Sequence, residues 1–67
     1  MLTTNISTAP VLKGTIKRFS EVGPYYQIGE AMEPLENGDW LYEITILESG
    51  EKAGYRLSHI KDDPKAV

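Results

Sequence analysis

The clearest pattern of apolar and polar positions lies in the second half of the chain, between residues 40 and 57. Apolar side chains recur at every second position on both sides of the polar segment 48–51, as two half-buried strands require. A two-residue loop at Ser49-Gly50 would place Ile44 opposite Tyr55 and gather the apolar side chains on one face. The pattern therefore predicts an antiparallel hairpin in this register.

Shorter patterns in the first half predict two further strands. Segment 11–19 alternates, with Ile16 on the apolar side. Segment 25–32 follows a Gly-Pro turn, and Gly29 within it indicates a bulge. The pair Asn37-Gly38 is typical of a tight turn with positive φ. No segment predicts a helix of useful length, and 57–63 is expected to form only a turn.

These elements predict an all-β fold, namely a small four- to five-stranded antiparallel barrel, SH3-like, or a strongly bent meander. We expect a flexible N-terminal segment at 1–10, a single small β domain at 11–64 and a C-terminal tail at 65–67. Whether the sheet closes into a barrel, and whether the chain is a monomer or a homodimer, stays open at this level.

Composition narrows the possible classes of protein. The chain has 67 residues and no cysteine, which leaves room for one small core without a disulfide or a thiolate metal site. It shows neither the features of a signal peptide nor an apolar stretch of the roughly 18 residues that a membrane span needs. We therefore expect a cytoplasmic protein that does not bind a membrane.

The order of charges along the chain is the most informative functional feature. The net charge is −3, and no Lys or Arg occurs between Phe19 and Glu51. Acidic residues fill that span: Glu21, Glu30, Glu33, Glu36, Asp39, Glu43, Glu48 and Glu51. One interpretation is an acidic surface that attracts a basic protein partner. The other is an ordinary mixed surface, in which basic outer strands neutralise acidic central ones.

An exposed aromatic side chain would complete such a binding surface. Adjacent tyrosines on a strand point to opposite faces, and Tyr26 shares the phase of Ile28, so Tyr25 is expected to point outward. Tyrosine is a favoured anchor in protein interfaces. The sequence thus predicts a non-enzymatic binding module with a regulatory or neutralising role. Its predicted partner-binding residues are Tyr25, Glu30, Glu33 and Glu36.

Other chemistries have weaker support. Lys13, Lys17 and Arg18 on the first strand suggest an alternative function as a nucleic-acid-associated small barrel, but the acidic balance of the chain disfavours nucleic acid. His59 with two nearby aspartates has the spacing of metal ligands on one helical turn, and nothing else in the sequence supports a metal. With a single histidine and no activated nucleophile, we expect no enzyme activity, no metal and no cofactor.

Several short strings are similar to those of a family of short uncharacterised bacterial proteins that carries a domain-of-unknown-function label. The strings are Gly23-Pro24-Tyr25-Tyr26, Glu33-Pro34, Gly38-Asp39-Trp40-Leu41, Ile46-Leu47-Glu48-Ser49-Gly50-Glu51, Tyr55-Arg56-Leu57 and Asp63-Pro64. The resemblance spans roughly residues 12–64 and implies a bacterial, cytoplasmic, single-domain protein. It implies no activity and no catalytic residues.

Overall fold

A computed structural model describes residues 9–66 of the chain. Most of the segment 1–10, which we expected to be flexible, lies outside the described residues. The elements in chain order are β1 (Ile16–Arg18), β2 (Tyr25–Pro34), the 3₁₀ turn η1 (Glu36–Gly38), β3 (Trp40–Ile46), β4 (Lys52–Arg56) and α1 (Leu57–Asp62).

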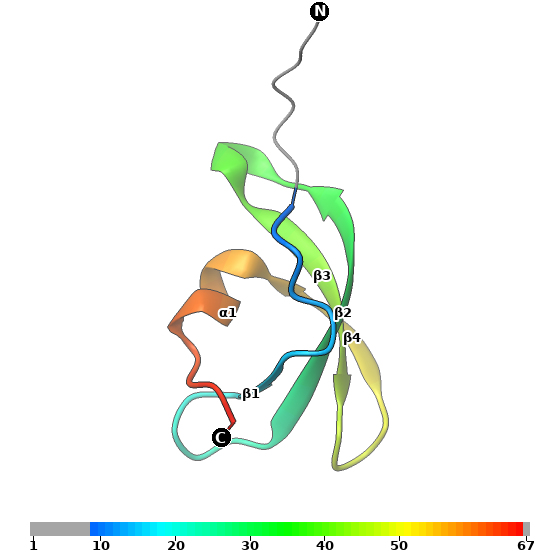
Figure 1. The fold of residues 1–67 in the computed structure, drawn as a ribbon, viewed down its shortest axis with the longest axis vertical. Helices are drawn as coiled ribbons and strands as arrows, with labels where there is room; N and C mark the ends of the chain where they lie inside the picture. Colours follow the sequence, from blue (N-terminus) through cyan, green and yellow to red (C-terminus); the bar gives the residue numbers. More distant parts are fainter. Residues whose placement is uncertain (1–8, 67) are drawn as a thin grey trace, which may run out of the picture.

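The four strands form one antiparallel sheet in the order β1-β2-β3-β4, which is a meander (Figure 1). The fold is mostly β, as predicted, but among residues 9–66 the sheet does not close into a barrel, because β1 and β4 are edge strands that do not pair with each other. The β1 edge is instead paired to the C-terminal segment, where Arg18 N–H donates to the carbonyl of Pro64 and Ala66 N–H donates to the carbonyl of Ile16.

A short helix, α1, stands where we expected only a turn. Its six residues are too few to show a helical period in the sequence. Leu57 and Ile60 are three positions apart, lie on one side of the helix and are buried. The helix is therefore held by packing against the sheet, since a helix of this length is not stable alone.

The β3–β4 hairpin has a different register from the predicted one. Tyr55 lies opposite Tyr42 and Ala53 opposite Ile44, so the prediction that Ile44 faces Tyr55 was wrong. The loop has four residues, 47–50, and is closed by Gly50 N–H donating to the carbonyl of Ile46 at 2.7 Å. Gly50 has a φ of 78°, which glycine adopts without strain. The longer loop moves the pairing by two residues, so every side chain keeps its predicted face.

The predicted first strand is shorter than expected and its faces are exchanged. A turn at Lys13-Gly14 leaves only three residues in β1. Lys17 lies opposite the buried Tyr26, and the ring of Phe19 packs 4.4 Å from that of Tyr26. Lys17 and Phe19 are therefore on the core side. Ile16, which we placed on the apolar side, is half-buried on the other.

The core lies between one face of the sheet and α1. Its buried residues are Tyr26, Ile28, Tyr42, Ile44, Leu57 and Ile60. Residues that pack around them include Ala9, Leu12, Phe19, Trp40 and Tyr55. The predicted bulge is confirmed by a register shift between Ile28 and Ala31. The turn at Asn37-Gly38 is confirmed as well, with φ angles of 61° and 76°.

Candidate functional site

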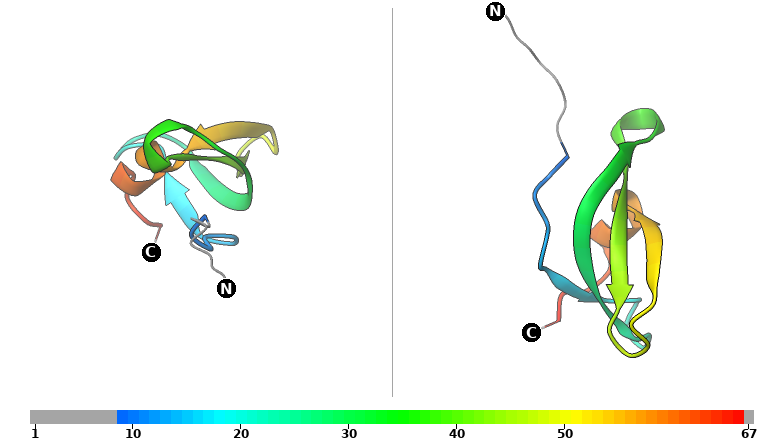
Figure 2. Two further views of the ribbon diagram at one scale, coloured as in Figure 1. Left: turned by 90° about the horizontal axis from the view of Figure 1, so that it is seen from above. Right: turned by 90° about the vertical axis from the view of Figure 1, so that its right-hand side faces the viewer.

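One face of the sheet packs against α1, and among residues 9–66 no helix or strand covers the opposite face. We call it the outer face. Figure 2 (right) shows β2, β3 and β4 in front with α1 behind them. Strand register places on it Tyr25, Gln27, Gly29 and Glu33 from β2, Leu41, Glu43 and Thr45 from β3, and Lys52, Gly54 and Arg56 from β4. Leu47 extends it beyond the end of β3.

One end of the outer face is apolar. Leu47 N–H donates to the carbonyl of Tyr25 at 3.0 Å, so the two residues lie side by side. Their exposed fractions are 44% for Tyr25 and 46% for Leu47. They line a shallow pocket together with Pro24 and Glu48. This end therefore offers apolar area that the fold itself leaves uncovered.

Arg18 holds the tyrosine from one side. Its guanidinium carbon lies 5.1 Å from the centre of the Tyr25 ring, and its Nε donates to the carbonyl of Gly23 at 2.9 Å. The cation–π contact contributes roughly 0.5–1 kcal/mol at such an exposed position. Tyr25 is thus partly ordered before any partner arrives, which lowers the entropy lost on binding.

Acidic side chains run along the rest of this face. Glu43 lies at the bulge, where a Cβ at position 29 would come within 3.1 Å of the Glu43 carbonyl oxygen, so glycine allows the close approach of the strands. Glu33 lies beyond it at the far end, opposite Leu41. Glu48 flanks the Tyr25 end. Within the described part of the chain, none of these three carboxylates forms an ion pair.

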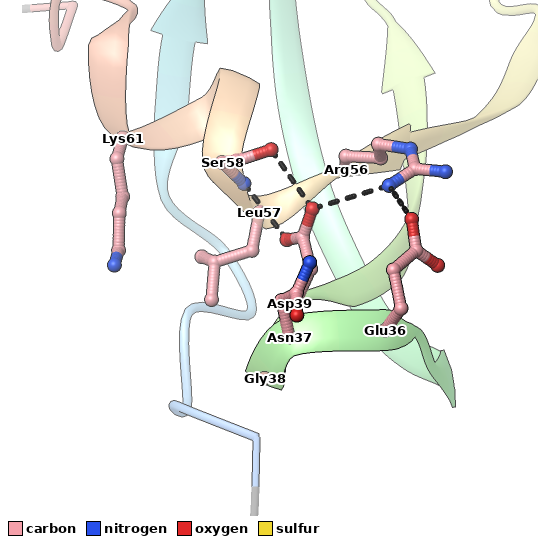
Figure 3. Close-up of a pocket in the computed structure, with 8 residues that line it drawn as sticks. All are labelled: Glu36, Asn37, Gly38, Asp39, Arg56, Leu57, Ser58 and Lys61. Atoms are coloured by element: carbon pink, nitrogen blue, oxygen red, sulfur yellow. Dashed lines mark hydrogen bonds and ion pairs between the residues drawn. The ribbon is translucent and has the colours of Figure 1, made fainter.

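A polar network joins η1 to the start of α1 (Figure 3). Arg56 donates to Glu36 at 3.0 Å and lies 3.5 Å from an oxygen of Asp39. Asp39 Oδ1 accepts from the backbone N–H of Ser58 at 3.0 Å, and Asp39 Oδ2 accepts from the Ser58 hydroxyl at 2.8 Å. Asp39 thus satisfies one backbone donor of α1 in the way an N-terminal capping residue does, although it is distant in sequence.

The titration of this network follows from its hydrogen bonds. Partial desolvation alone would raise the pKa of Asp39, but the bonds from Ser58, Trp40 and Arg56 outweigh it and hold the pKa below its usual value. Its own backbone N–H and then the Arg56 guanidinium lower the pKa of Glu36. The network is therefore charged and internally satisfied at neutral pH, which is typical of a structural cluster.

A second polar cluster surrounds Asp63. Asp63 Oδ2 accepts hydrogen bonds from the hydroxyls of Tyr26 at 2.7 Å and Tyr55 at 3.1 Å, and Oδ1 accepts from Ser20 N–H at 3.1 Å. Burial, followed by the bond to Asp63, raises the pKa of Tyr26. The His59 ring packs edge-on 5.5 Å from that of Tyr55. This cluster fixes the C-terminal segment beside β1.

The predicted partner-binding residues do not form one cluster. Tyr25 and Glu33 lie on the outer face, separated along β2 by about 25 Å at the usual rise per residue of a strand. Glu30 pairs with Lys13 at 2.6 Å, and Glu36 pairs with Arg56. Two of the four predicted residues are therefore already engaged with basic side chains, although exposed pairs of this kind contribute little and open readily.

The predicted basic strand is dispersed in a similar way. Lys13 pairs with Glu30, Lys17 donates to the carbonyl of Ile60, and Arg18 lies over Tyr25. These three residues thus face in different directions. Across residues 9–66, no group of three His, Cys, Asp or Glu side chains is placed to hold a metal ion. No helix in the same part of the chain is long and apolar enough to cross a membrane.

The sequence interpretation missed two features of this surface. The sequence predicts Leu47 as part of a strand and gives no sign that it lies exposed beside Tyr25, because that contact comes from the pairing of β2 with β3. Asp39 was counted among the acidic surface residues, although an aspartate directly after Asn-Gly is a common local signal for a turn or cap. Its partner in α1 is far along the chain, and no sequence spacing indicates that contact.

Comparison with known proteins places the chain in a bacterial context. A family model described as "Family of unknown function (DUF5397)" matches residues 4–67, which extends the match expected from the sequence toward both ends. An uncharacterised protein of Haemophilus influenzae is 53% identical over 53 residues, covering 79% of this chain and 84% of its own length.

Proposed function

Since the chain belongs to the family of unknown function DUF5397, we propose from the geometry of its surface that it is a small non-enzymatic binding module for a protein partner with a basic surface, in the cytoplasm of a bacterium. Its role would be regulatory or neutralising. The single observation that carries this proposal is the outer face, on which the exposed pair Tyr25 and Leu47 lies at one end of a row of unpaired glutamates.

The apolar end and the acidic part of the outer face contribute differently to binding. An aromatic and a leucine side chain that become fully buried supply most of the lasting affinity, because hot spots concentrate in desolvated apolar centres. The carboxylates of Glu33, Glu43 and Glu48 attract a basic surface and orient it before contact. A face about 25 Å long also suits a standard interface, which covers on the order of 800 Å² on each partner.

Lys52 and Arg56 lie on β4 at the border of the same face and make that border basic. Arg56 is held by Glu36 and Asp39, so its charge is largely compensated within the molecule. A basic partner therefore meets the acidic row over β2 and β3 and is repelled at Lys52. This distribution of charge therefore attracts the basic partner and also determines the orientation in which it binds.

The test is affinity capture from the native host with three forms of the protein. We expect wild type to retain a basic protein, and Tyr25→Ala combined with Leu47→Ala to lose it. Met32→Ala is the matched control, since Met32 is 49% exposed and lies on β2 far from Tyr25. Retention of the same partner by the double variant would contradict the proposal.

The alternative function, association with nucleic acid through Lys13, Lys17 and Arg18, is tested with wild type and with charge-reversal variants. Mobility shift with single- and double-stranded probes at physiological salt should show no binding. Binding that Lys17→Glu with Arg18→Glu abolishes, while charge reversal at Glu33 and Glu43 leaves it intact, would replace the protein-partner proposal.

A further inference from the structure

On the core side of the sheet, away from the outer face, β1 and α1 enclose a second hollow. It has a volume of about 220 Å³. Its apolar lining comes from Pro10, Leu12, Leu57 and Ile60. Figure 1 shows β1, α1 and the C-terminal segment on the same side of β2 and β3.

The rim of this hollow is basic. Lys17, Lys61 and Lys65 line it, with Thr15 as a further polar residue, and no acidic residue does. The chain has only seven basic residues and a net charge of −3, so the concentration of three lysines at one hollow is unexpected. Within residues 9–66 none of the three forms an ion pair.

Two of these lysines have defined placements. Lys17 is half-buried, and its ammonium donates one hydrogen bond to the carbonyl of Ile60. An ammonium has three N–H donors, so Lys17 retains two that the bond to Ile60 does not use. In Figure 3 the Lys61 side chain stands apart from the Asp39–Arg56 network and makes no bond within it, and Lys61 borders both the pocket drawn there and this hollow.

From this arrangement we infer that the hollow binds a small amphipathic anion, namely an apolar body that carries one carboxylate or phosphate group. The apolar body rests on Leu12, Leu57 and Ile60, and the anionic group lies among the three ammonium groups. Electrostatic attraction to a partly desolvated lysine is stronger than to one in bulk water. The volume is below the roughly 300–1,000 Å³ of pockets for drug-sized ligands, so the ligand is small.

A purely structural role for these lysines predicts different behaviour. Lys17 and Lys61 lie near the C-terminal end of α1, where positive charge stabilises a helix. In that case their removal changes only stability and no ligand saturates the hollow. A binding role predicts saturable binding that requires both the charge and the apolar body.

The experiment is a titration of ¹⁵N-labelled protein followed by amide chemical shifts. The probes are octanoate, 1-octanol as the neutral equivalent and inorganic phosphate as the anion without an apolar body. We expect octanoate to give saturable shifts at Leu12, Thr15, Lys17 and the residues of α1, and to bind at least about fivefold more tightly than the other two. Equal binding of 1-octanol, or shifts located elsewhere, would overturn the inference.

Matched variants separate local charge from net charge. Lys61→Gln with Lys65→Gln should weaken octanoate binding about fivefold, because each exposed charge interaction contributes modestly. Lys13→Gln with Lys52→Gln removes the same charge away from the hollow and should leave the affinity unchanged. Equal weakening by both pairs would overturn a local site. Vesicles containing phosphatidylglycerol distinguish the source of the anion, since binding to them without binding of octanoate would overturn the inference of a small soluble ligand.

Discussion

Ser58 receives the cap of its helix from Asp39, 19 residues earlier in the chain. The backbone N–H of Ser58 donates to one carboxylate oxygen at 3.0 Å and its hydroxyl donates to the other at 2.8 Å. The contact joins the end of η1 to the start of α1 and so fixes the helix over the core. It leads to the first two predictions.

Replacing Asp39 by alanine should destabilise the protein, because the backbone N–H and the hydroxyl of Ser58 at the start of α1 lose their acceptor. We expect a decrease in Tm of about 5 °C, since the loss of one cap has an effect of this order in a domain of this size. Thermal unfolding by circular dichroism measures it. Glu36→Ala is the control, because Glu36 is exposed, and it should change Tm much less. Equal effects would show that Asp39 has no capping role.

The stability of the protein should also fall in acid, because Asp39 becomes protonated there. The pKa of Asp39 is lower in the folded protein than its usual value near 4. The folded state therefore binds fewer protons than the unfolded state in this range, so the contribution of Asp39 is complete above the unfolded pKa and is lost as the pH falls through the lower folded pKa. Denaturant unfolding at several pH values between 2 and 6 should show a smaller acid loss for Asp39→Asn than for wild type. A parallel loss in both proteins would assign the acid sensitivity to other groups.

The third prediction concerns the stability that the core side chains contribute. Ile44 has an exposed fraction of 1%, and Trp40 packs against the buried cluster, so Ile44→Ala and Trp40→Ala should each lower the free energy of unfolding by about 3 kcal/mol. Tyr25→Ala should lower it by less than about 1 kcal/mol, because its ring lies on the surface. Denaturant titration compares the three. A large loss for Tyr25→Ala would mean that the ring supports the fold rather than a partner.

The strand register can be checked directly. Glu43 lies opposite Gly54 and Thr45 opposite Lys52. Ile46 and Glu51 form a hydrogen-bonded pair, and hydrogen-bonded and non-hydrogen-bonded pairs alternate along an antiparallel ladder. Both of the pairs named above are therefore non-hydrogen-bonded, and their α protons approach closely. Strong NOEs between those α protons are expected. Strong α-proton NOEs between Thr45 and Gly54 would instead favour a two-residue loop, because that loop makes these two residues a non-hydrogen-bonded pair.

Once a partner is in hand, the two parts of the outer face should separate in binding kinetics. Charge reversal at Glu33 and Glu43 should slow association about tenfold at low salt and reduce its salt dependence, because these carboxylates act before contact. Tyr25→Ala should mainly accelerate dissociation. Surface plasmon resonance at two salt concentrations measures both rates. Charge reversal at Glu30 and Glu36, which are already paired, serves as the control and should slow association less.

The sequence by itself determined the local features of this protein. Alternation along β2 and β3 identified the strands and placed Tyr25 outside and Tyr26 inside, because successive side chains on a strand point to opposite faces. Gly29 indicated the bulge and Asn37-Gly38 the positive-φ turn, since both depend on a few neighbouring residues. These features need only local backbone chemistry.

Tertiary structure decided what depends on distant contacts. The sequence predicted a two-residue hairpin loop, but the loop has four residues and Tyr55 lies opposite Tyr42. The helix α1 is too short to form by propensity and exists because Leu57 and Ile60 are buried and Asp39 caps it. Lys17, Lys61 and Lys65 likewise come together at one hollow only through tertiary contacts. Residues so far apart in sequence come together only when the chain is folded, and no periodicity records such a contact.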